Sequence, residues 1–114
     1  MDTTTPTIDI RGDVPESTVA LVMSLTEAKQ LVSGVKRSDL VLINLSCESP
    51  TAVSKITKLE KALSEISDKE LPDQVIMLHI TLKEVLSLSK AIYRLRLDSL
   101  IAKISDLYID SITS

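Results

Sequence analysis

Residues 74–84 read QVIMLHITLKE, a short apolar run followed directly by the start of a helix. The run at 74–80 has the length and composition of a buried strand. Thr81 and Glu84 then have the spacing of a capping box, in which the hydroxyl accepts a hydrogen bond from the amide three residues on and the carboxylate reaches back. This stretch therefore predicts a strand that runs straight into a helix.

The same order recurs twice upstream. Residues 18–23 form an apolar run, and Ser24 and Glu27 provide a second capping box for a helix that we expect to end at Gly34 in a left-handed conformation. Residues 39–45 are apolar on both faces, as a strand in a covered parallel sheet requires, and Ser49 with Pro50 then begins another helix. The last helix is expected over residues 82–112, which contain no glycine or proline.

The pattern β-α-β-α-β-α predicts an α/β fold with a small parallel sheet of three strands, in two or three layers with right-handed crossovers. We interpret residues 1–17 as a flexible tail or, over 7–11, as a fourth strand at the sheet edge. Residues 18–114 are expected to form one domain, which includes the long C-terminal helix.

Composition narrows the classes of function. The net charge is −3 and the only aromatic residues are Tyr93 and Tyr108, so nucleic acid is a disfavoured partner. No apolar run approaches the length of a membrane span, and the first residues lack the pattern of a secretory signal, so we expect a cytoplasmic protein with no membrane contact. One cysteine excludes an internal disulfide. The scarcity of Asn, Gln and Gly is typical of heat-adapted proteins, although fifteen serines argue against that source.

The expected last helix is longer than the domain that would carry it. A helix over residues 82–112 spans roughly 45 Å, whereas a domain of this size is only about 35 Å across. Its end nevertheless carries the heptad-like apolar seam of a coiled coil. Together with the flanking tyrosines and Ile101, the seam residues are the predicted interface: Tyr93, Leu97, Leu100, Ile101, Ile104, Leu107 and Tyr108.

Three arrangements would cover this seam. The helix pairs with its copy in a homodimer, it breaks near residues 95–98 and folds back on its own sheet, or it binds a different protein. Because a sheet of three strands also leaves two edges to be covered, we favour the homodimer.

Polar residues near the expected strand ends form the only candidate ligand site. In a parallel sheet the carboxyl ends of the strands and the helix N-termini would meet there. Cys47 and His79 could in principle form a nucleophilic pair, but a buried cysteine and a half-buried histidine are the commoner roles. One histidine and one cysteine do not make a metal site, and we expect no cofactor. The candidate ligand residues are Ser46, Cys47, Ser49, His79 and Thr81.

These observations favour a non-enzymatic structural or adaptor protein that dimerises through its C-terminal helix. The alternative is a small regulatory protein that binds nucleic acid or a small anion at the carboxyl ends of the strands.

Overall fold

Three strands form a mixed sheet in the computed structural model, which describes residues 7–11, 17–65 and 74–113. β3 (Val75–Ile80) lies in the centre, between β1 (Thr7–Ile10) and β2 (Val19–Ser24). β1 pairs with β3 in parallel, which places the predicted edge strand in the sheet, but β2 pairs with β3 antiparallel. The mixed α/β class is confirmed, whereas the expectation of an all-parallel sheet is wrong.

Both predicted capping boxes are present. The Ser24 hydroxyl accepts from the Glu27 amide at 3.1 Å at the start of α1 (Leu25–Arg37), and the Ser24 amide donates to Glu27 at 2.9 Å. Thr81 and Glu84 make the same pair of bonds at the start of α4 (Leu82–Leu95), with distances of 3.2 and 2.8 Å. β2 and β3 therefore each lead directly into a helix, as the sequence predicts.

Gly34 does not end α1. The helix continues to Arg37, and Gly34 has no left-handed backbone. A Cβ atom at this position would lie 2.9 Å from Cδ1 of Leu95, at the end of α4. The glycine thus allows α1 and α4 to approach each other closely. It does not end α1, which is the role that the sequence predicted for it.

Residues 39–45, predicted as the second strand, belong to helix α2 (Asp39–Glu48). The Ser38 hydroxyl caps this helix by accepting from the amide of Val41 at 3.3 Å. A short apolar run fits a buried strand and a helix equally well, and the leucines in this run favour the helix. α3 (Pro50–Glu65) begins after Ser49, so α1, α2 and α3 are separated only by two single serines.

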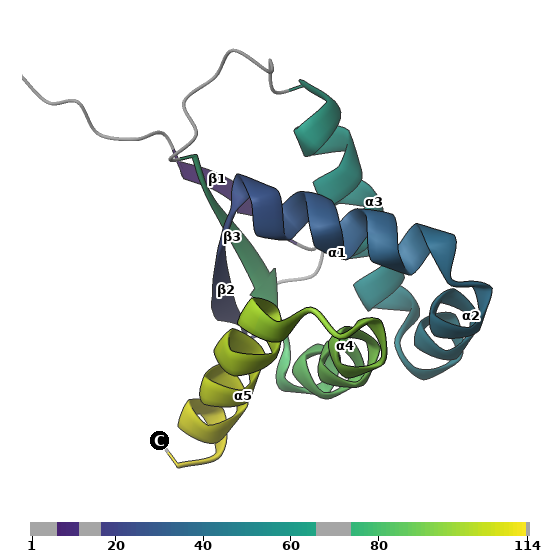
Figure 1. The fold of residues 1–114 in the computed structure, drawn as a ribbon. Coiled ribbons are helices and arrows are strands. Elements are labelled where there is room, and N and C mark those ends of the chain that lie inside the picture. Colours follow the sequence, from purple (N-terminus) through teal and green to yellow (C-terminus); the bar gives the residue numbers. More distant parts are fainter. Residues whose placement is uncertain (1–6, 12–16, 66–73, 114) are drawn as a thin grey trace, which may run out of the picture.

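The predicted last helix is two helices. α4 ends at Leu95, and α5 runs over Asp98–Thr113. Arg96 between them has a left-handed backbone, with φ 57° and ψ 41°, and its amide donates to the carbonyls of Ile92 and Tyr93. The chain turns there, and α5 packs against α4 and β2 (Figure 1). The expectation of one continuous helix is wrong, and the fold-back arrangement is the one observed.

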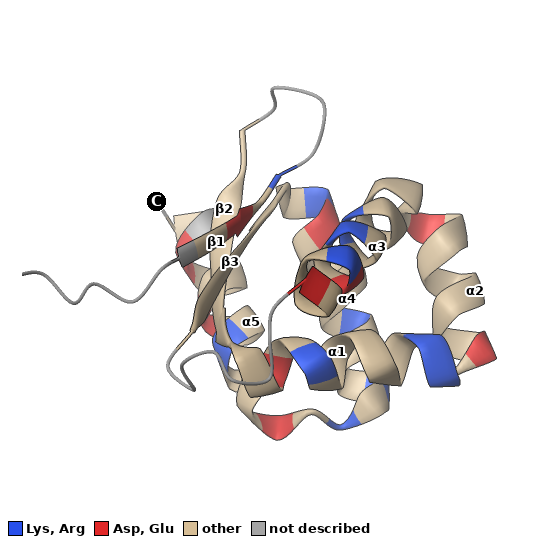
Figure 2. Cartoon of the chain, turned by 90° about the horizontal axis from the view of Figure 1, so that it is seen from above, with Lys and Arg blue, Asp and Glu red and all other residues tan. Residues whose placement is uncertain are grey.

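The core lies between one face of the sheet and the helices. Figure 2 shows α1, α3 and α4 on one side of the sheet. Ile76, Leu78 and Ile80 of β3 point to that side and are fully buried, whereas Val75, Met77 and His79 alternate with them and are only half-buried. The described part of the chain is thus a sheet layer covered by a helix layer, which matches the two-layer form of the predicted architecture.

Candidate functional site

The bend at Arg96 covers most of the predicted interface within one chain. Leu100 and Ile104 have no exposed surface and belong to the core. Tyr93, on α4, is 56% exposed and is the only predicted interface residue that is exposed. The other four are partly buried and pack against the core: Leu97, Ile101, Leu107 and Tyr108. The geometric mismatch that made a dimer seem necessary is therefore absent.

The outer face of α4 carries an apolar stripe of which only Tyr93 was in the predicted interface. Leu82, Leu86 and Tyr93 are 46%, 44% and 56% exposed. Their spacings of four and seven residues place them on one line along the helix, opposite the buried residues Leu88 and Ala91. The sequence could have shown this stripe, because Leu82, Leu86 and Tyr93 are large apolar residues at positions outside the buried face of an amphipathic helix.

Basic side chains border this stripe. Lys83, Lys90 and Arg94 are exposed on α4, and Arg96 follows at the bend. Lys90 donates to Glu48 of α2 at 3.0 Å, in an ion pair whose two side chains are 65% and 42% exposed. The only acidic residue of α4, Glu84, is buried. The exposed surface of α4 is therefore apolar and positively charged.

The outer face of α5 has the opposite charge. Asp98, Asp106 and Asp110 are exposed, and Ile109 and Ile112 are 53% and 56% exposed. The helix also has one basic residue, Lys103, but it pairs with Glu27 of α1. Figure 2 marks these acidic and basic positions on the ribbon.

A smaller apolar surface lies on α2. Leu40 and Ile43 are 61% and 59% exposed, and Cys47 is exposed on the next turn of the same face. In Figure 1 this helix lies at the end of the molecule away from the sheet. Among the described residues, the large apolar side chains that are well exposed lie on α2, α4 and α5, apart from Val22 on β2.

The predicted ligand residues do not converge on one site. Ser46 and Cys47 are exposed on α2. His79 lies on the sheet face opposite the helices, where its Nε2 is 3.3 Å from Asp9 Oδ1. Ser49 and Thr81 do come near each other, since both belong to a polar network around Glu84. The antiparallel direction of β2 and the helical form of 39–48 remove the strand ends at which the five residues were expected to meet.

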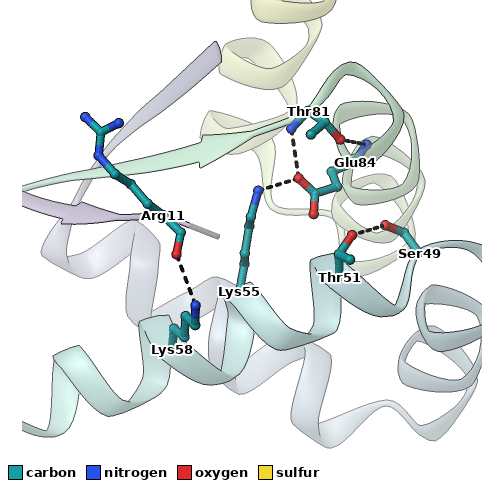
Figure 3. A network of polar contacts seen from close by, with 7 residues as sticks. All are labelled: Arg11, Ser49, Thr51, Lys55, Lys58, Thr81 and Glu84. Carbon is teal, nitrogen blue, oxygen red and sulfur yellow. Dashed lines mark hydrogen bonds and ion pairs between the residues drawn. The ribbon is translucent and has the colours of Figure 1, made fainter. Parts of the chain in front are cut away.

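This network lies between α3 and the start of α4 (Figure 3). Lys55 donates to the same carboxylate oxygen of Glu84 that accepts from the Thr81 amide. The Lys55 and Glu84 side chains are only 6% and 2% exposed. Thr51 also reaches Glu84, and the Ser49 and Thr51 hydroxyl oxygens are 3.4 Å apart. The buried pair therefore joins α3 to α4, with the capping box at its centre.

Electrostatics keep Glu84 ionised despite its burial. Burial by itself raises the pKa of a carboxyl group, but hydrogen bonds from Lys55, the Thr81 amide and Thr51 outweigh this effect and lower the pKa of Glu84 below its ordinary value. General acid or base catalysis requires a group that a substrate can reach with a pKa near neutrality, and Glu84 has neither property. We assign the network a structural role.

Glu27 repeats this arrangement at the start of α1. Burial alone would raise its pKa, but Lys103, the Ser24 amide and Ser99 stabilise the carboxylate, and the net effect lowers the pKa from 4.5 to about 2. Lys103 and Ser99 both belong to α5. The capping residue of α1 thus also fastens α5 to the body of the protein.

Other features of the described residues do not form a recognisable chemical site. One depression of about 460 Å³, open to solvent, lies along α1 beside Leu97, with Lys29 and Arg37 at its wall. Within the ranges that the structure describes, no three His, Cys, Asp or Glu side chains gather as a metal site would require. No helix in these ranges has the length and apolar character needed to cross a membrane.

Comparison of the chain with models of protein families, with curated proteins and with solved structures gave no match. The geometry of the described residues points to the outer surface of α4 and α5 as the candidate site.

Proposed function

We propose that this protein is a non-enzymatic structural or adaptor protein that associates with itself through the outer surface of α4 and α5. The observation that carries the proposal is the stripe of Leu82, Leu86 and Tyr93, three large side chains that remain about half exposed on one helix face. Exposed apolar side chains that are grouped on one face mark binding surfaces more often than single exposed ones do. The C-terminal segment thus remains the proposed interface, but with different residues at its centre.

The buried groups support a non-enzymatic role. The two carboxylates with lowered pKa, Glu27 and Glu84, each pair with a lysine and cap a helix. Cys47 and His79, the residues that a nucleophilic site would need, lie on different elements and face different surroundings.

Sedimentation equilibrium over a concentration series tests this proposal. The wild-type chain is expected to reach more than the mass of one chain at tens of micromolar, and Leu86→Asp is expected to return it to monomer, because a charge at the centre of the stripe cannot be buried without a partner. Leu40→Asp on α2 is the matched control, since Leu40 is even more exposed but lies outside the proposed surface. A monomeric wild-type chain would rule the proposal out.

A second candidate function is binding of a polyanion such as nucleic acid. The exposed Lys83, Lys90, Arg94 and Arg96 favour it, because a row of basic side chains can contact phosphates. The apolar residues between them favour a protein partner instead. Fluorescence anisotropy with labelled duplex DNA at low and moderate salt distinguishes the two, and the absence of a salt-dependent signal would eliminate this candidate.

A further inference from the structure

The surfaces of α4 and α5 have complementary chemistry. The outer face of α4 presents apolar side chains bordered by the exposed Lys83 and Arg94 and by Lys90, which pairs with Glu48 of α2. α4 itself has no exposed carboxylate. A helix that fits this face needs a few aliphatic side chains and a negative charge, because basic groups left against a neutral or basic surface would lose hydration without compensation.

The outer face of α5 meets this requirement. It offers Ile109 and Ile112 together with Asp98, Asp106 and Asp110, and the three aspartates form no ion pair with any residue that the structure describes. Its lysine is already paired with Glu27, which leaves the exposed surface of the helix negative.

Within one chain these two faces cannot contact each other. α4 and α5 pack together through their buried residues, so their exposed residues point away from the contact between the two helices. Only another molecule can bring a basic α4 face against the acidic face of α5. The complementary surface is present in every copy of the chain, so no second protein is needed to explain it.

We infer that the occupant of the α4 surface is the α5 surface of a second copy of this chain, and that the same contact is made reciprocally. This inference rests on the proposed self-association and specifies its geometry. Because α4 and α5 are neighbours in each chain, a two-fold arrangement makes both contacts at once and closes the assembly as a dimer. The apolar residues provide affinity. The charges favour pairing of α4 with α5 of the other copy over pairing of α4 with α4.

Charge reversal tests the pairing. A basic-to-acidic variant, Lys83→Glu with Arg94→Glu, makes the outer faces of α4 and α5 both acidic. An acidic-to-basic variant, Asp106→Lys with Asp110→Lys, makes both faces basic. Each variant alone is expected to raise the dissociation constant of the dimer by about tenfold or more, because like charges then oppose each other in both contacts. Mixing the two variants is expected to restore dimers, since every contact again joins opposite charges.

The controls reverse charge elsewhere on the molecule. Lys29→Glu with Lys61→Glu changes the net charge by the same amount as the first variant, but on α1 and α3, and it is expected to leave the dissociation constant within about twofold of the wild-type value. Circular dichroism checks that each variant is folded.

The outcomes separate this inference from the proposed function. Self-association of the wild type that both single-sign variants retain unchanged would overturn the α4 to α5 pairing and leave self-association standing. Loss of association in each variant without recovery on mixing would likewise overturn the pairing. A wild-type chain that stays monomeric would remove both proposals together.

Discussion

At the scale of single residues, Glu27 and Glu84 each connect local and distant parts of the chain. Each is the third residue of a helix and completes a capping box, and each accepts from a lysine on another element. The capping boxes could be predicted from the sequence, because their residues are three apart. Lys103 lies 76 residues from Glu27 and Lys55 lies 29 residues from Glu84, so these partners could not be predicted from local spacing.

The lowered pKa of Glu27 predicts how stability depends on pH. Its pKa is about 2 in the folded protein against 4.5 as the ordinary value, so its contribution is fully present above about pH 4.5 and is lost as the pH falls toward 2. Because the Lys103 side chain is 43% exposed, solvent screening reduces this contribution to about 1–2 kcal/mol. Glu84 acts in the same direction.

Glu27→Gln is therefore expected to lower the free energy of unfolding by about 1–2 kcal/mol at pH 7 and to flatten its decline between pH 4.5 and 2. Urea denaturation at several pH values measures both effects. Glu65→Gln, at an exposed position of α3, serves as the control and is expected to change neither. An acid limb as steep in Glu27→Gln as in the wild type would contradict the assignment.

At the scale of elements, two segments were not predictable from pattern alone. The run at 39–45 is too short for its apolar residues to distinguish a buried strand from a helix, and only the Ser38 cap and the contacts of Val41 and Leu45 decide it. The bend at residue 96 contains neither glycine nor proline. The bend allows Leu100 and Ile104 to be buried. The free energy gained by burying them exceeds the free energy lost by holding Arg96 in a left-handed conformation.

The backbone at Arg96 makes a direct prediction. A residue with a side chain loses about 1 kcal/mol in the left-handed region, whereas glycine adopts it freely, so Arg96→Gly is expected to stabilise the folded chain by several tenths to about 1 kcal/mol. Thermal denaturation measures this change. Lys61→Gly, in the interior of α3, is expected to destabilise by about 1 kcal/mol. Equal destabilisation by both substitutions would argue against a left-handed bend.

At the scale of the whole molecule, the fold was predicted in class but not in topology. The strand at 74–80, the edge strand at 7–11 and the strand-to-helix junctions follow from apolar runs and capping residues. The direction of β2 does not, because it depends on where three consecutive helices return the chain to the sheet. Leu82 and Leu86 were not predicted as interface residues, because the prediction treated 82–112 as one straight helix and placed the interface in its second half.

Helices α4 and α5 bury the apolar seam of the C-terminal segment within one chain, and the outer face of α4 is the surface proposed to bind another copy. Methyl NMR spectra of the wild-type chain over a dilution series test it most directly, because each leucine and isoleucine reports separately. The account predicts that the methyl signals of Leu82, Leu86 and Ile109 shift on dilution, while those of Leu100 and Ile104 stay fixed in the core. Shifts at Leu100 and Ile104, or no shift at Leu82 and Leu86 across a change in mass, would contradict it.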